Sequence, residues 1–191
     1  MEFFDSHAHL NDEKFCEDMV EVINSVYNQG ITKFICAGYS LESSKKAIEI
    51  SNEYSFIYPT CGISPNDIPQ NEEELWKQLE QIKDLLNKKN KIVAIGEIGL
   101  DYYWNKENKD LQKIAFTEQI KIANEYNLPI QIHTREAVMD TIDILKKNNV
   151  IRKGIFHCCP LNRELVKEAL KLDFYISFAG PVTFKNYKNA E

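Results

Sequence analysis

The sequence has 191 residues, of which 43% are hydrophobic and 27% are charged, a composition typical of a soluble globular protein. It contains no apolar run of the roughly 18 residues that a membrane-spanning helix needs, and it does not open with the basic and apolar segments of a secretion signal, so we expect a cytoplasmic protein. The net charge of −6 and the lack of a dense Lys/Arg cluster argue against tight binding to nucleic-acid phosphates. They do not exclude an enzyme that meets phosphates through bound metal ions.

The first predicted element is an extended strand with the sequence Phe3-Phe4-Asp5-Ser6-His7-Ala8-His9-Leu10. Side chains alternate between the two faces of a strand, so His7 and His9 point the same way and Ala8 points away. Two neighbouring neutral imidazoles can share a divalent metal ion. Two polar residues at a solvated strand end would give the same pattern, and the histidine pair alone does not separate these interpretations.

The rest of the chain alternates between short apolar strands and amphipathic helices. We predict further strands at residues 33–38, 56–62, 92–97, 128–133, 154–157 and 174–178, and helices near 15–26, 41–48, 72–86, 111–126, 138–145 and 165–172. Short apolar strands are typical of a parallel sheet covered by helices, and the alternation predicts an α/β fold with right-handed crossovers. A doubly wound open sheet also fits this alternation, but no glycine-rich nucleotide-binding loop follows any strand.

All four histidines of the chain lie at the ends of predicted strands. His7 and His9 end the first strand, His133 ends the fifth and His157 ends the sixth, while Glu97 ends the fourth. The carboxyl ends of the strands form the active-site face of a (β/α)₈ barrel. We therefore predict that these five side chains converge on one metal site.

Several motifs, taken together and in this order, carry a resemblance to a known family. They are Asp5-Ser6-His7-Ala8-His9-Leu10, Gly96-Glu97-Ile98-Gly99-Leu100-Asp101-Tyr102-Tyr103, His133-Thr134-Arg135-Glu136-Ala137, Phe156-His157-Cys158 and Tyr175-Ile176-Ser177-Phe178. The chain resembles the TatD family of metal-dependent deoxyribonucleases, within the amidohydrolase superfamily. This resemblance implies a TIM-type (β/α)₈ barrel and a phosphodiesterase that acts on DNA with one or two divalent ions, Mg²⁺, Mn²⁺ or Zn²⁺.

The resemblance also implies roles for the predicted ligands. His7 and His9 would bind the first metal ion, His133 and His157 the second, and Glu97 would bridge both as the catalytic carboxylate. A carboxylate can span two ions about 3.5–4 Å apart. Glu97 stands where many amidohydrolases have a carboxylated lysine, and this difference favours phosphodiester hydrolysis over amide or lactone hydrolysis.

Two further residues are predicted to contact the substrate. Arg135 lies two residues beyond His133, and its guanidinium matches the geometry of a phosphate. A salt bridge or a carbonyl clamp at the rim would explain Arg135 equally well. Tyr102 and the aromatic residues that follow it could stack on bases, or they could simply pack against the barrel.

The length of the chain leads to one further expectation. A barrel of this type takes about 250 residues, whereas only seven strands are predicted here, and the aspartate that ends the family's eighth strand has no counterpart. We expect a single domain, residues 1–191, that lacks the last strand and the C-terminal helix of the barrel. DNA is the expected substrate, with no obligate protein partner and no membrane contact, and the complete protein is expected to be a monomer.

Two alternatives to deoxyribonuclease activity remain open at this point. The same metal site could hydrolyse an ester or amide bond, as in a D-aminoacyl-tRNA deacylase. The chain could also be a catalytically impaired form that only binds metal or a partner.

Overall fold

The computed structural model describes residues 1–88, 90–160 and 162–185. Within them, parallel strands are hydrogen-bonded side by side in sequence order. The strands are β1 (Phe3–Ala8), β2 (Ile31–Cys36), β3 (Ile57–Cys61), β4 (Ala94–Asp101), β5 (Ile130–Arg135), β6 (Gly154–Phe156) and β7 (Tyr175–Ile176). The helices are α1 (Met19–Asn28), α2 (Leu41–Glu53), α3 (Glu72–Asn87), α4 (Lys109–Glu125), α5 (Val138–Lys147) and α6 (Arg163–Lys171), with short 3-10 turns η1 (Glu13–Phe15) and η2 (Gly180–Thr183).

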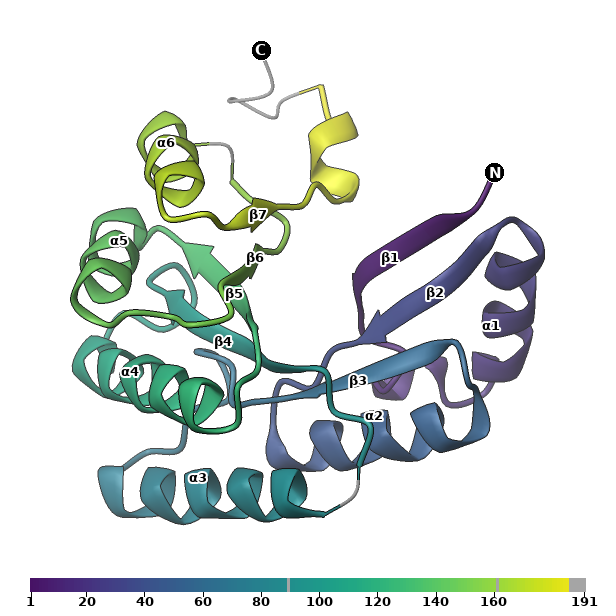
Figure 1. Ribbon diagram of the computed structural model, residues 1–191, viewed down its shortest axis with the longest axis horizontal. Coiled ribbons are helices and arrows are strands. Elements are labelled where there is room, and N and C mark those ends of the chain that lie inside the picture. Colours follow the sequence, from purple (N-terminus) through teal and green to yellow (C-terminus); the bar gives the residue numbers. More distant parts are fainter. Residues whose placement is uncertain (89, 161, 186–191) are drawn as a thin grey trace.

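The sheet is curled, and the helices lie in an arc around its outer side (Figure 1). Helices on one side only are the arrangement of a barrel-type fold rather than of a doubly wound sheet, which carries helices on both faces. The predicted alternation and the parallel sheet are confirmed. β1 and β7 are the two edges, and within the described residues they do not pair with each other. None of the described helices combines the length and apolar character needed to cross a bilayer.

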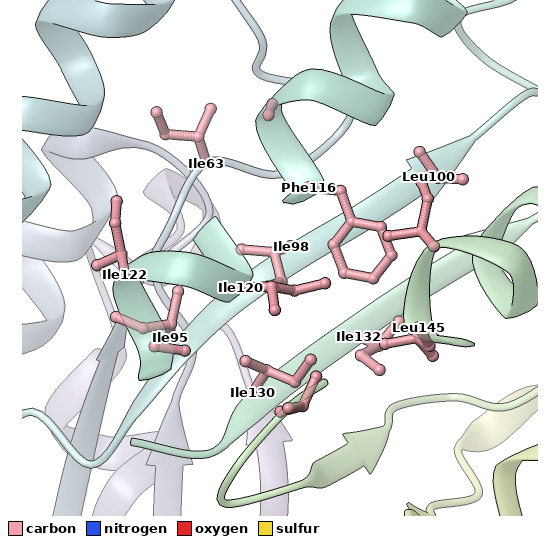
Figure 2. Close-up of a cluster of buried hydrophobic side chains, with 14 of the residues drawn as sticks. Ile63, Ile95, Ile98, Leu100, Phe116, Ile120, Ile122, Ile130, Ile132 and Leu145 are labelled. Carbon is pink, nitrogen blue, oxygen red and sulfur yellow. The ribbon is translucent and has the colours of Figure 1, made fainter. Parts of the chain in front are cut away.

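The core lies between the sheet and the arc of helices. Its larger cluster is formed by β3 to β6 with α3 to α6, and it includes the fully buried side chains of Ile98, Phe116 and Ile132 (Figure 2). A smaller cluster packs α1 and α2 against β2 and β3 around Ile23 and Phe34. This packing fixes the outer face of each strand, so the opposite face is left for polar side chains.

Strand β4 is longer than predicted and ends at Asp101 instead of residue 97. Its second half is buried and pairs with β5 as far as Arg135. A register irregularity between Ile95 and Ile98 precedes this half. Beyond it, Ile98 turns to the core with the helices, and the period-two alternation gives Glu97 and Asp101 the opposite, inner face.

The start of the first helix is also different from the prediction. The turn η1 is followed by α1 only from Met19 onward, so Phe15 lies in the turn and not in the helix. Helix α3 begins as predicted, because the side chain of Asn71 accepts a hydrogen bond from the Glu74 N–H and three glutamates occupy the first turn.

Candidate metal centre

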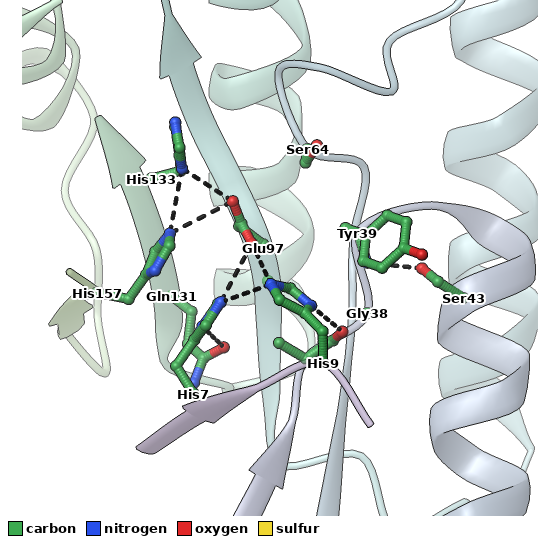
Figure 3. Close-up of polar contacts among 12 residues, drawn as sticks. His7, His9, Gly38, Tyr39, Ser43, Ser64, Glu97, Gln131, His133 and His157 are labelled. Carbon is green, nitrogen blue, oxygen red and sulfur yellow. Dashed lines mark hydrogen bonds and ion pairs between the residues drawn. The ribbon is translucent and has the colours of Figure 1, made fainter. Parts of the chain in front are cut away.

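The carboxyl ends of β1, β4, β5 and β6 bring five side chains together (Figure 3). They are His7 and His9 from the end of β1, Glu97 from β4, His133 from β5 and His157 directly after β6. The parallel strands all end at the same rim of the curled sheet. Residues more than a hundred positions apart in the sequence therefore become neighbours.

Glu97 lies at the middle of this arrangement and is buried. Its Oε2 is 3.2 Å from His7 Nε2 and 3.3 Å from His9 Nε2. Its Oε1 is 2.9 Å from His133 Nδ1 and 3.3 Å from His157 Nε2. Each carboxylate oxygen therefore serves one pair of imidazoles.

The five residues form two ligand sets that share Glu97. The first group is His7, His9 and Glu97, and the second group is Glu97, His133 and His157. In each group the ligand atoms lie within 4.8 Å of one another, which is close enough for one metal ion. The rings of His7 and His157 stack across the two groups with their centroids 3.8 Å apart.

The outer nitrogens of the first-group imidazoles are held by neutral acceptors. His7 Nδ1 donates to Gln131 Oε1 at 3.2 Å, and His9 Nδ1 donates to the Ala37 carbonyl at 3.2 Å. A proton held on Nδ1 leaves Nε2 as the lone-pair nitrogen that faces Glu97. Ligand histidines in metalloproteins are oriented by outer partners in this way.

In the second group the outer partner is a carboxylate. His133 Nε2 donates to Asp101 Oδ2 at 3.0 Å, and Asp101 is completely buried. This hydrogen bond leaves Nδ1 of His133 directed at Glu97. The other oxygen of Asp101 accepts hydrogen bonds from the backbone N–H groups of Tyr103 and Trp104, each at 2.9 Å.

The ionisation of the site follows from burial and these contacts. Burial alone would raise the pKa of Glu97, but its contacts with the four imidazoles outweigh burial and hold that pKa well below its ordinary value. Burial would lower the pKa of His133, whereas its hydrogen bonds to Asp101 and Glu97 raise it to about 9. Burial lowers the pKa of His157 to about 4. An anionic carboxylate among oriented imidazoles is a donor set that suits divalent ions such as Zn²⁺ or Mn²⁺.

The two predicted substrate residues lie in different environments. Arg135 is exposed at the end of β5. Tyr102 is only 8% exposed, and its hydroxyl donates to Asp140 Oδ2 at 2.6 Å. A ring buried in this way offers no face to a base, so its placement does not favour the predicted contact. The exposed aromatic side chains of this loop are Tyr103 and Trp104.

The sequence predicts that Asp101 caps or orients the loop that follows it, as its contacts with Tyr103 and Trp104 show. The sequence reasoning missed Gln131 and the role of Asp101 as the outer partner of His133. Gln131 lies two residues before His133 in an otherwise apolar strand, so it shares the inner face with this ligand. Asp101 lies two positions beyond Gly99, which pairs with His133 in the β4–β5 register. A polar residue at period two from a predicted ligand, within an apolar strand, is the signal that could have indicated both.

Comparisons with known proteins agree with this geometry. A family profile described as TatD-related DNase matches residues 4–191. The metal-dependent hydrolase YabD of Bacillus subtilis is 44% identical over 188 residues, which are 97% of this chain and 71% of that protein. The metal-dependent hydrolase YcfH of Escherichia coli is 33% identical, with 95% of this chain and 68% of the relative covered.

Solved structures show the same fold. The crystal structure of YjjV, a TatD homologue from Escherichia coli, superposes with a TM-score of 0.88 at 25% identity and covers 95% of this chain and 70% of that one. A TatD family hydrolase from Entamoeba histolytica gives a TM-score of 0.84 at 25% identity, covering 100% of this chain and 69% of that one. The curled sheet thus corresponds to about 70% of a TatD barrel, and the chain belongs to the TatD-related DNase family of metal-dependent hydrolases.

Proposed function

We propose that this protein hydrolyses phosphodiester bonds of DNA with divalent ions held by His7, His9, Glu97, His133 and His157. The observation that carries the proposal is the position of the Glu97 carboxylate between the two pairs of imidazoles. One of its oxygens faces His7 and His9, and the other faces His133 and His157. Mg²⁺, Mn²⁺ and Zn²⁺ are the proposed cofactors. Membership of the TatD-related DNase family supports DNA as the substrate class.

The protein's own residues prepare the site for this chemistry. Bound divalent ions supply an activated water and stabilise the charge on a phosphodiester and its leaving oxygen. Glu97 contributes a buried negative charge, and the outer partners Gln131, Ala37 and Asp101 hold three imidazoles in fixed orientations. A protein of net charge −6 repels DNA at long range, so local positive charge at this rim must attract the phosphates.

The test uses the purified chain after removal of metal with EDTA and reloading with Mg²⁺, Mn²⁺ or Zn²⁺. Labelled DNA should be shortened only in the presence of metal, and the products are read on a sequencing gel. Glu97→Gln should abolish the activity, whereas Glu80→Gln, a matched change on the exposed face of α3, should retain it. Metal-dependent activity that survives Glu97→Gln at the wild-type rate would contradict the proposal.

The ester-hydrolase alternative is tested in parallel with D-aminoacyl-tRNA as the substrate. Metal-dependent deacylation without DNA cleavage would contradict the proposal and would assign the same metal site to ester hydrolysis. Metal binding without turnover of either substrate would instead identify a protein that binds metal without catalysis.

A further inference from the structure

We propose that Arg135, Tyr103 and Trp104 form a nucleotide-binding platform beside the metal centre. In this platform Arg135 contacts a phosphate of the substrate strand, and Trp104 stacks on an adjacent base. The inference rests on the proposed hydrolysis of DNA, and it names the residues that recognise the substrate.

The guanidinium of Arg135 is held by two aromatic rings. Its Cζ lies 4.1 Å from the ring centroid of Tyr103 and 5.5 Å from that of Trp104. The two rings are nearly perpendicular, with an interplanar angle of 87°. Stacking occupies a face of the guanidinium and leaves its in-plane N–H donors for an anion.

Arg135 has no acidic partner among residues 1–88, 90–160 and 162–185, whereas His7 and His133 each contact a carboxylate. The rim salt bridge that would have explained Arg135 structurally is therefore not present in that part of the chain. An arginine that is oriented by aromatic rings but carries an unneutralised charge matches the geometry of a phosphate.

The position of Arg135 connects the platform to the metal centre. It follows His133 by two residues on β5, and both side chains line a cavity of about 310 Å³ together with His157 and Pro181. A phosphate bound by Arg135 at this cavity would lie next to the second group of ligands.

The loop that carries the aromatic rings is fixed and not free. The buried carboxylate of Asp101 accepts the N–H groups of both Tyr103 and Trp104, and Asp101 pairs with Arg135 in the strand register. Trp104 is nevertheless 68% exposed and Tyr103 is 44% exposed. Aromatic rings held in place but open to solvent are suited to base stacking and are not explained by core packing.

The experiment measures binding of a fluorescein-labelled single-stranded oligodeoxynucleotide by anisotropy, with the full chain in EDTA so that no cleavage occurs. Trp104→Ala should weaken binding by roughly 5- to 150-fold, the range for loss of one base stack. Arg135→Gln should weaken it by about 10-fold or more, because a charge-assisted contact is lost. Trp104→Phe and Arg135→Lys should bind with intermediate affinity.

Two matched variants serve as controls. Trp76→Ala removes another exposed tryptophan, on α3, whose indole N–H donates to Glu72. Arg163→Gln removes another exposed arginine, at the start of α6. Both should bind the oligonucleotide like the wild type.

The outcomes separate this inference from the proposed function. One outcome is that the wild type cleaves DNA with metal, while Trp104→Ala and Arg135→Gln bind the oligonucleotide as tightly as the wild type. The platform is then wrong and the proposed function stands. If binding depends on both residues but no metal gives cleavage, the platform stands and the function falls. Absence of wild-type binding in EDTA would overturn the platform as well.

Discussion

The two ligand groups share Glu97 but are supported differently. Both histidines of the first group lie at the end of β1, His7 within it and His9 directly after it. β1 is an edge strand that is paired only with β2 in the described part of the chain. Their outer partners, Gln131 and the Ala37 carbonyl, are neutral, and the side chain of His9 is 34% exposed.

The second group is built on interior strands. β5 and β6 each have a neighbour on both sides, and the side chains of His133 and His157 are 18% and 10% exposed. The outer partner of His133 is the buried carboxylate of Asp101, which makes a charge-assisted hydrogen bond. The second group is therefore more strongly oriented, and we expect it to hold metal more tightly than the first.

The largest effect is expected from Glu97→Ala, which removes the ligand common to both groups. Both metal affinities should fall and metal-dependent hydrolysis should drop below detection. Elemental analysis after gel filtration gives the metal content, and circular dichroism checks the fold. Retention of metal and turnover by a folded Glu97→Ala protein would show that Glu97 does not join the two groups.

A smaller and asymmetric effect is expected from Asp101→Asn. Loss of the charged outer partner of His133 should weaken metal binding by roughly 10- to 100-fold in the second group and leave the first group nearly unchanged. Calorimetric titration in a His9→Ala background isolates the second group.

The matched control is Asp140→Asn, an aspartate that bonds to Tyr102 and Lys113 and touches no predicted ligand. Nitrogen-detected NMR adds a readout that general destabilisation would not change. The metal-free wild type should show His133 as an imidazolium, protonated on both nitrogens, at pH values below its raised pKa of about 9, and Asp101→Asn should lower that pKa. Equal metal affinities for Asp101→Asn and the wild type would remove the basis for ranking the two groups.

Gln131, the neutral partner of His7, should contribute less to metal affinity than Asp101 does. Gln131→Leu removes the hydrogen bond that orients His7, and the expected loss of first-group affinity is roughly 2- to 10-fold, as for a neutral hydrogen bond. The titration is done in a His157→Ala background. A loss larger than that of Asp101→Asn in the second group would reverse the comparison.

The predicted ligand set follows from features that a sequence displays directly. His7, Glu97, His133 and His157 each lie at or near the end of a predicted strand, and parallel strands in sequence order bring their ends to one rim. The contact of each Glu97 oxygen with a different pair of imidazoles depends on the side-chain geometry at that rim. No pattern in the sequence reports this geometry.

The features that the sequence does not report depend on tertiary packing. Tyr102, Tyr103 and Trp104 are consecutive, and the sequence does not show which of them turns inward. Tyr102 does so because its hydroxyl reaches Asp140 on α5, a contact between elements far apart in the chain. The extension of β4 to Asp101 depends likewise on pairing with β5, which was not visible from β4 alone.

The smallest effect concerns the stability of the fold at low pH, in a region away from both ligand groups. Glu168 on α6 is bound by Lys146 Nζ and Lys171 Nζ, each at 2.6 Å, and these lysines lower the pKa of the carboxyl from its ordinary 4.5 to about 2. A carboxyl with a lowered folded-state pKa stabilises the fold above the unfolded-state pKa, and this stabilisation is lost as the pH falls through about 2.

The free energy of unfolding of the metal-free chain, measured by urea titration, should therefore decline as the pH falls from about 4.5 towards 2. Glu168→Gln should be less stable than the wild type at neutral pH, and the difference should shrink through this range, because glutamine does not titrate. A difference that stays constant with pH would mean that the two lysines do not set the ionisation of Glu168. Metal loss observed above this range can then be attributed to the ligand groups.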